Sequence, residues 1–310
     1  MPARRILLAT LVTLGTLPLF GASCDKKSVA DTTPVASPVV LAAPAGAGAG
    51  SKPPVAPVLP GIDSTALGVA ARARLAQLGD KLASPCGKAH SLRKSLETDA
   101  ACKRAPFAGR YVVRLLALDL TDEEIGAAYG ARYASTAPLT IPVDAAAYEG
   151  QPRATVRIVE FFDYGCPHCR LVLPVLEELV RRYAGDVVVY FKHYPLGGRA
   201  ESVQAAMAAL SAQRQGKFRE LHKRMLDGQD DLSRPALLRY ARAARLDEQQ
   251  TARDLDDPRL RERVLADKAD GERAGLEGTP TLFVNGRLYT DPNTPELLAD
   301  WIDEELAVNR

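Results

Sequence analysis

Two cysteines separated by two residues have the spacing of a redox-active pair. An apolar run from Val156 to Phe162 is followed by Gly165 and then by Cys166-Pro-His-Cys169, and a helical pattern continues to about Tyr183. A strand is therefore predicted to deliver the pair to the N-terminus of a helix. Free backbone N–H groups and the helix dipole stabilise a thiolate there, which is the nucleophilic form of cysteine. We expect Cys166, at the exposed end, to attack and Cys169 to resolve a mixed disulfide.

The elements predicted around this pair alternate between strands and helices. The expected strands cover residues 155–161, 187–191, 281–284 and 287–289, and the last two are joined by an Asn285-Gly286 hairpin turn. The expected helices cover residues 167–183 and 295–308, with a long helix-rich stretch without a strand over residues 198–274. This order predicts an α/β domain with a helical insertion.

Several dispersed motifs make residues 143–310 resemble the DsbA-type branch of the thioredoxin superfamily. The Cys166-Pro-His-Cys169 run repeats the Cys-Pro-His-Cys of that branch, and Pro174 matches the proline within the active-site helix. Glu160 matches the buried acidic residue of the branch, and Lys192 matches the lysine that partners it. The segment Gly278–Gly286 resembles the cis-proline loop, which makes Pro280 the expected cis residue. The resemblance implies a thioredoxin fold with a helical insertion.

The resemblance also implies roles for the side chains around the sulfurs. The ring N–H of His168 is expected to reach the Cys166 sulfur and favour its thiolate. Pro280 is expected beside the sulfurs, where backbone edge groups pair with an extended substrate. Thr279 departs from the valine of DsbA and is more like the isomerase branch. Glu160 with Lys192 is either a proton relay for Cys169 or an ordinary salt bridge at the strand edge.

The implied function is the donation of disulfides to reduced or unfolded exported proteins, with a membrane oxidase of the DsbB or VKOR type as redox partner and no cofactor. The alternatives are a reductase or isomerase, including one that serves cytochrome c maturation, and a redox-inactive scaffold. A zinc site is disfavoured because no second C-x-x-C or H-x-x-x-H pattern is present, and His193 and His222 are interpreted as surface or packing residues. No metal is expected.

The first 24 residues have the pattern of an export signal. Arg4 and Arg5 precede an apolar run from Ile6 to Phe20 that is too short to span a bilayer, and Gly21-Ala-Ser-Cys24 resembles a bacterial lipobox. The two interpretations are lipidation of Cys24, which would tether a periplasmic protein to a membrane, and ordinary signal cleavage. Residues 25–62 are rich in Pro, Ala and Gly and are predicted to be a disordered tether.

Residues 63–136 are predicted to form a small all-α module. Helices are expected over residues 64–82, 90–102, 106–118 and 122–133, and Thr121 with Glu124 forms a capping box at the last one. Its helical run weakly resembles a domain of the CcmH family, although the paired cysteines of that family are missing. Cys86 and Cys102 are interpreted as a structural disulfide, as a second redox pair or as free thiols.

Composition excludes several classes of protein. The chain has 310 residues, of which 46% are hydrophobic and 25% charged, so it is not collagen-like, coiled-coil or wholly disordered. The net charge is only +2, which gives no support to a nucleic-acid partner. The five cysteines divide into Cys24, the pair in the helical module and the pair at 166 and 169.

Overall fold

The computed structural model describes residues 57–133, 137–197 and 200–310. The predicted export signal, Cys24 and residues 25–56 of the predicted tether lie outside these described residues. These described residues belong to one compact unit. No helix within the described ranges is both long and apolar enough to cross a membrane.

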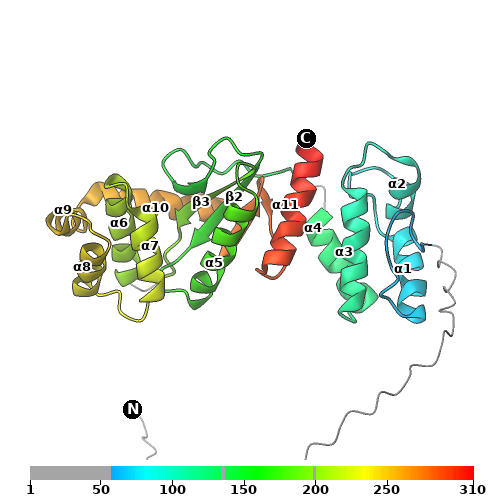
Figure 1. Cartoon of the computed structure of the whole chain (residues 1–310), viewed down its shortest axis with the longest axis horizontal. Helices are drawn as coiled ribbons and strands as arrows, with labels where there is room; N and C mark the ends of the chain where they lie inside the picture. The colour runs from blue at the N-terminus through cyan, green and yellow to red at the C-terminus, as the bar shows by residue number, and fades with distance from the viewer. Residues whose placement is uncertain (1–56, 134–136, 198–199) are drawn as a thin grey trace, which may run out of the picture. The chain divides into compact units, whose positions relative to one another are not determined.

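The helical module has four helices with a core of their own (Figure 1). The helices are α1 (Val69–Lys81), α2 (Leu92–Thr98), α3 (Ala105–Ala117) and α4 (Asp122–Tyr133). The predicted capping box is confirmed, because the backbone N–H of Thr121 donates to the Glu124 carboxylate at 2.8 Å and the backbone N–H of Glu124 donates to the Thr121 hydroxyl at 3.2 Å. α1 begins later than expected, since Gly68 at its N-cap is extended.

The predicted tether is too long at its C-terminal end. Leu59 is fully buried and Ile62 is 2% exposed, and both belong to the core of the helical module. A Cβ atom on Gly79 would lie 2.4 Å from the Leu59 side chain, and one on Gly109 would lie 2.6 Å from Ile62. These two aliphatic side chains therefore fill spaces that the two helical glycines leave open, which a composition-based prediction of disorder cannot detect.

The remainder of the described chain is built on one five-stranded sheet with the order β1-β3-β2-β4-β5. The strands are β1 (Ala147–Gly150), β2 (Val156–Phe162), β3 (Val187–His193), β4 (Thr281–Val284) and β5 (Arg287–Leu288). β2 and β3 are parallel, and every other neighbouring pair is antiparallel. The predicted hairpin turn is confirmed, since Asn285 and Gly286 both have positive φ angles, of 48° and 79°.

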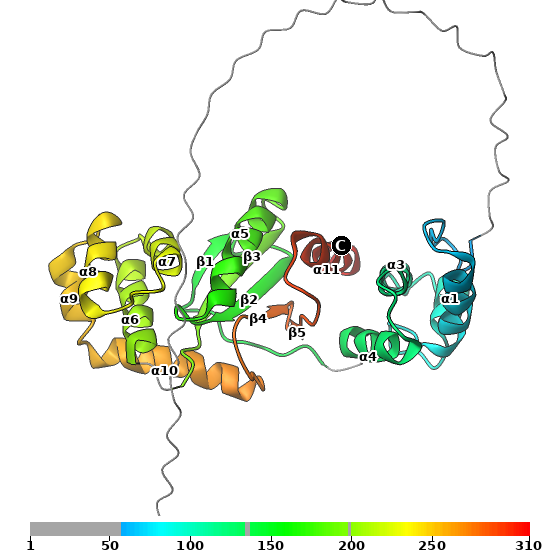
Figure 2. The same cartoon turned by 90° about the horizontal axis from the view of Figure 1, so that it is seen from below.

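The helices of this part cover both faces of the sheet. α5 (Pro167–Arg182) and α11 (Pro295–Asn309) contact the strands, and their buried side chains share the main core with Val156 and Ile158 of β2. α10 (Pro258–Arg273) also contacts β3. The helices α6 (Ala200–Arg214), α7 (Phe218–Asp227), α8 (Arg234–Ala243) and α9 (Glu248–Asp254) gather on the β1 side of the sheet (Figures 1 and 2). α6 to α10 are the predicted helical insertion.

A buried ion network joins α4 to α11 within this compact unit. The Arg132 side chain is fully buried, and its guanidinium lies 2.7 Å from Glu304, 3.0 Å from Asp300 and 3.4 Å from Asp291. Arg104 and Arg287 also pair with Glu304, which is fully buried as well. Burial alone would raise the pKa of Glu304, but the three guanidinium groups together lower it below the ordinary value of 4.5.

Candidate active site

The cysteine pair lies where β2 passes into α5. Cys166 is the N-cap residue of α5 and Cys169 lies in its first turn, which confirms the predicted placement at a helix N-terminus. Cys166 is 6% exposed and Cys169 is 1% exposed, so the nucleophile predicted at the exposed end is itself buried, although it is the more accessible of the two. Pro167 and His168 between them are exposed.

The loop that carries Cys166 is held by a buried aspartate. Asp163 follows β2 directly and is 3% exposed. Its carboxylate accepts hydrogen bonds from the backbone N–H of Gly165 and of Leu196, both at 2.9 Å, and its carbonyl accepts one from the backbone N–H of Cys166 at 3.0 Å. Sequence reasoning missed Asp163, although an Asx-type turn two residues before a glycine is a recognisable signal.

A glutamine from the helical insertion also fixes this loop. The side-chain amide of Gln229, which follows α7, donates to the carbonyl of Tyr164 at 2.9 Å and to the carbonyl of Cys166 at 3.0 Å. One residue therefore holds the backbone on both sides of Gly165. Gln229 is 63 positions from Cys166 in the sequence, and no local pattern could have assigned it to the site.

The cis-proline loop reaches the Cys166 sulfur. The peptide bond between Thr279 and Pro280 is cis, as predicted. β4 follows this loop and pairs antiparallel with β2, with Thr281 opposite Phe161, which brings the loop to the end of β2 that carries the cysteines. The Cys166 thiol donates a hydrogen bond to the Thr279 carbonyl, with 3.2 Å between sulfur and oxygen.

Glu160 is the buried acidic group of the site. It is 2% exposed, and no hydrogen-bond or ion-pair partner for it is found within the described ranges. Burial raises its pKa from 4.5 to about 8. Burial also raises the pKa of the Cys169 thiol well above its ordinary value, and the nearby Glu160 raises it further. Both groups therefore favour their protonated forms.

The structure corrects the expected pairing of Glu160 with Lys192. In the parallel ladder Glu160 lies beside Phe191, whereas Lys192 lies beside Phe161. Successive side chains of a strand point to opposite faces, so Lys192 faces away from Glu160. Its ammonium group instead pairs with Asp267, at 3.1 Å, and with Asp270, and it donates to the carbonyl of Pro142 at 2.8 Å.

His168 differs from expectation as well. Its side chain is exposed, and no hydrogen bond from its ring to Cys166 is found in the part of the chain that the structure describes. α5 buries Cys169, Val172 and Leu173. The helical period of 3.6 residues places His168 outside this buried face, on the side of α5 that faces solvent.

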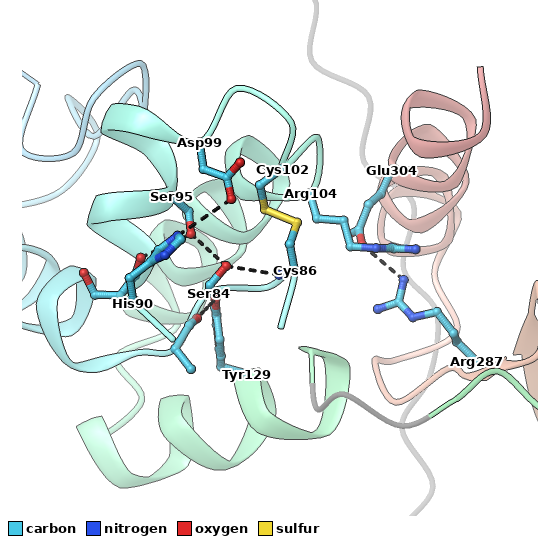
Figure 3. Close-up of a disulfide and its surroundings, with 12 residues drawn as sticks. Ser84, Cys86, His90, Ser95, Asp99, Cys102, Arg104, Tyr129, Arg287 and Glu304 are labelled. Carbon is cyan, nitrogen blue, oxygen red and sulfur yellow. Dashed lines mark hydrogen bonds and ion pairs between the residues drawn. A yellow bond between two sulfur atoms is a disulfide. The ribbon is translucent and has the colours of Figure 1, made fainter. Parts of the chain in front are cut away.

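Cys86 and Cys102 form a disulfide, so the free-thiol interpretation is wrong (Figure 3). Cys102 is 4% exposed and packs in the core of the helical module. The Ser84 hydroxyl accepts from the backbone N–H of Cys86 at 3.3 Å and from the Ser95 hydroxyl at 2.9 Å, which ties the disulfide loop to α2. These contacts favour a structural role.

Two buried histidines lie close to the active-site loop. His193 and His222 are both 2% exposed, and burial lowers the pKa of the first to about 4 and of the second to about 3. Nδ1 of His222 shares a hydrogen bond of 2.9 Å with the Tyr164 hydroxyl. Both rings pack against Phe162, which confirms the interpretation of these histidines as packing residues. Among described residues, no group of three or more metal-ligating side chains is assembled.

Comparisons with known proteins agree with this architecture. A family model described as thioredoxin matches residues 144–304, just over half of the chain. The oxidised form of BdbD from Bacillus subtilis matches with a TM-score of 0.50 and 21% identity, covering 55% of this chain and 97% of that one. A thioredoxin-like oxidoreductase from Silicibacter pomeroyi has a TM-score of 0.48 and 31% identity, covering 52% of this chain and 91% of that one.

Curated relatives match over a similar length. A Na(+)/H(+) antiporter NhaA 1 of Mycolicibacterium gilvum is 34% identical over 146 residues, which are 46% of this chain and 24% of that protein. An NhaA 3 antiporter of Salinispora tropica is 37% identical over 164 residues, which are 52% of this chain and 25% of that protein. This chain thus spans about a quarter of the length of these relatives. The antiport activity in their names belongs to those longer proteins.

The chain belongs to the thioredoxin family. Its thioredoxin fold places a cysteine pair at a helix N-terminus, and Cys166 faces a cis-proline loop across the end of the central strand β2.

Proposed function

We propose that the protein donates disulfides to exported proteins through Cys166 and Cys169. The observation that carries this proposal is the position of Cys166, which is the N-cap residue of α5 and whose sulfur lies 3.2 Å from the carbonyl oxygen of Thr279. A helix N-terminus stabilises a leaving thiolate in general, and a disulfide whose reduced form is stabilised in this way acts as an oxidant.

The proposed reaction is a two-electron exchange. A substrate thiolate attacks the Cys166 sulfur of the oxidised pair, the bond between the two cysteines breaks, and Cys169 leaves as a thiolate. A second substrate thiolate then attacks the substrate sulfur of this mixed disulfide and releases Cys166. The substrate gains one disulfide and loses two thiol protons, and the protein ends with Cys166 and Cys169 reduced.

Glu160 is proposed as the proton donor to Cys169. A carboxyl whose pKa is about 8 holds its proton at neutral pH. Glu160 lies close enough to Cys169 for its charge, once ionised, to raise the pKa of that thiol. The leaving thiolate of Cys169 is strongly disfavoured by burial, so a proton close by lowers the barrier to its departure. Lys192 is on the other face of the sheet and has no part in this step.

Pro280 and Thr279 are proposed to present the substrate. Because Pro280 has no backbone N–H, the backbone group exposed beside the Cys166 sulfur is the carbonyl of Thr279. An extended substrate segment would pair with that edge while its cysteine meets Cys166. Because His168 is exposed at the same helix terminus, its side chain would contact the bound substrate or the redox partner.

The proposed location is outside the cytoplasm. The Cys86–Cys102 disulfide supports it, because structural disulfides persist in oxidising compartments. The predicted signal and the lipidation of Cys24 would tether the protein to a membrane, in the periplasm. Its proposed partners are reduced exported proteins and a membrane oxidase of the DsbB or VKOR type that reoxidises Cys166 and Cys169.

Two replacements test the chemistry. Cys166→Ser is expected to abolish disulfide transfer to a reduced substrate, whereas Cys169→Ser is expected to accumulate mixed disulfides with substrate on non-reducing gels. Changing Cys86 and Cys102 together to serine removes the two cysteines of the helical module without freeing one of their thiols, and is the control. If both site variants keep wild-type activity, the assignment of the pair is refuted.

The reduction potential of the pair decides the direction of the reaction. A value of about −120 mV is expected for a donor of disulfides, and a value of about −270 mV would mark a reductase. The isomerase-like Thr279 is the observation that keeps the reductase or isomerase as a second candidate. Equilibration of the purified protein with glutathione buffers measures this potential.

A further inference from the structure

A second concave site lies between β1, the middle of α5 and the start of α7. It encloses about 530 Å³, a volume typical of small-ligand pockets. Leu173, Phe191 and Phe218 supply apolar side chains to its lining, and charged side chains stand around them. The pocket therefore combines an apolar surface with a polar rim, and none of the proposed thiol chemistry uses it.

The rim carries more negative than positive charge. Glu149 of β1 and Glu177 of α5 have side chains that are only 18% and 20% exposed. Both pair with the same guanidinium, that of Arg219, at 3.1 Å and 3.5 Å, and this side chain is 64% exposed. Burial raises the pKa of Glu149, Arg219 opposes this, and Glu177 raises it again. With Glu220 also lining the pocket, three carboxylates stand against one cation.

A buried nitrogen in the lining lacks a partner. His222 lines the pocket, its ring stacks on Phe218 at 4.9 Å, and its Nδ1 is engaged by Tyr164. Its Nε2 has no hydrogen-bond partner among the described residues. Buried polar atoms are nearly always satisfied in folded proteins, so a polar group entering the pocket could complete this one.

We propose that this pocket binds an organic cation with an apolar stem, an alkylammonium, benzylammonium or guanidinium group. The cation would take the place that Arg219 fills only partly between Glu149 and Glu177, and its stem would pack on Phe191 and Phe218. Two sources share this chemistry, a free amine and a lysine or arginine side chain of a polypeptide. The proposal holds whichever way the thiol exchange runs.

Binding can be read directly at the pocket. The full chain labelled with ¹⁵N-histidine gives ring signals from only four histidines, which single replacements assign. The probes are benzylamine for a free amine, the peptide acetyl-Ala-Lys-Ala-amide for a polypeptide side chain, and benzyl alcohol as the neutral control. We expect a saturable shift of the His222 signal with at least one of the two cations, and at least tenfold weaker binding of benzyl alcohol.

Variants localise the binding to the rim. Glu177→Gln removes one carboxylate and is expected to weaken binding about fivefold, the factor for one partly exposed charge pair. Glu178→Gln makes the same change one position along α5, outside the pocket lining, and is expected to leave the affinity unchanged. Binding of benzylamine alone identifies a free amine as the source, and binding of the peptide identifies a polypeptide.

Three results would each overturn the proposal. The first is no shift of His222 with either cation up to about 10 mM, which corresponds to a binding free energy too weak for a built site. The second is equal binding of benzyl alcohol. The third is equal affinity of the Glu177→Gln and Glu178→Gln variants. None of these results bears on disulfide transfer, which the cysteine variants test separately.

Discussion

Replacing Glu160 by glutamine is expected to stabilise the reduced protein, and more so as the pH rises. Glu160 is 2% exposed and has no partner within the described ranges, so its ionisation leaves a buried charge uncompensated. Glutamine has nearly the shape of the protonated carboxyl and cannot ionise. The variant therefore keeps the packing of the protonated form and removes the cost of the charged one.

The size of the effect follows from the pKa of Glu160 in the two states. The carboxyl ionises near 4.5 in the unfolded chain and near 8 in the folded one. Below about pH 4 both states are protonated and the group contributes nothing. Between pH 4.5 and about pH 8, Glu160 is ionised in the unfolded chain and protonated in the folded one. The free energy of unfolding of the wild type therefore falls as the pH rises, by about 1.4 kcal/mol for each pH unit. The gain of Glu160→Gln is thus about 1 kcal/mol at pH 5 and roughly 4 kcal/mol at pH 8.

Urea unfolding of reduced wild type and variant at several pH values between about 5 and 8 measures this difference. Glu178→Gln on α5 controls for the loss of one negative charge without the buried site. A difference that stays constant across the pH range would refute the argument, because a hydrogen bond that the amide makes or breaks does not titrate. A variant that is less stable than wild type at pH 8 would refute it as well. Slower release of Cys169 in the same variant would support the proposed proton transfer.

Three further replacements test parts of the helical module. Changing Cys86 and Cys102 together to serine is expected to lower the free energy of unfolding by about 3 kcal/mol with little change in disulfide transfer, and loss of turnover in a folded protein would show a redox relay instead. Leu59→Ala is expected to cost about 2 to 5 kcal/mol by urea unfolding, and no cost would contradict its burial in the core. Arg132→Met is expected to lower stability by about 3 kcal/mol and Tm accordingly, because three buried carboxylates lose one of their cations, and an unchanged Tm would show that the remaining arginines suffice.

The elements that carry the chemistry could be predicted because their signals are local. An apolar strand, the Cys-Pro-His-Cys turn and an amphipathic helix follow one another in the sequence, and the structure places Cys166 and Cys169 as expected. The Asn285-Gly286 turn requires positive φ at both positions, which these two residue types adopt at low cost. The cis bond at Pro280 is implied by a motif of several residues.

The strand β1 could not be predicted, because its stability comes from its neighbour. Its four residues contain no β-branched side chain, and β-propensity largely measures packing against adjacent strands. At its end, Gly150 has a φ of 101°, and a Cβ atom there would lie 2.4 Å from the carbonyl oxygen of Val187. The glycine is needed for the close approach to β3, yet in the sequence it resembles an ordinary loop residue.

The contacts of Gln229 and Lys192 could not be predicted either, because their partners are far away in the sequence. Gln229 holds the active-site loop from the helical insertion, far away in the sequence. Lys192 has the expected place at the end of β3, but the acids that pair with it, Asp267 and Asp270, come from α10. The choice among alternative carboxylates depends on which face of the sheet each residue takes, and this depends on strand register.

That register also determines the chemistry available to Glu160. A shift of β3 by one residue along β2 would place Lys192 beside Glu160, on the face that α5 covers. An ammonium group at that position would favour the ionised carboxylate, and Glu160 would no longer hold a proton at neutral pH. In the observed register Phe191 lies beside Glu160, so burial acts on the carboxyl without a compensating cation and raises its pKa to about 8. The proposed proton donor for Cys169 therefore depends on Lys192 facing the other side of the sheet.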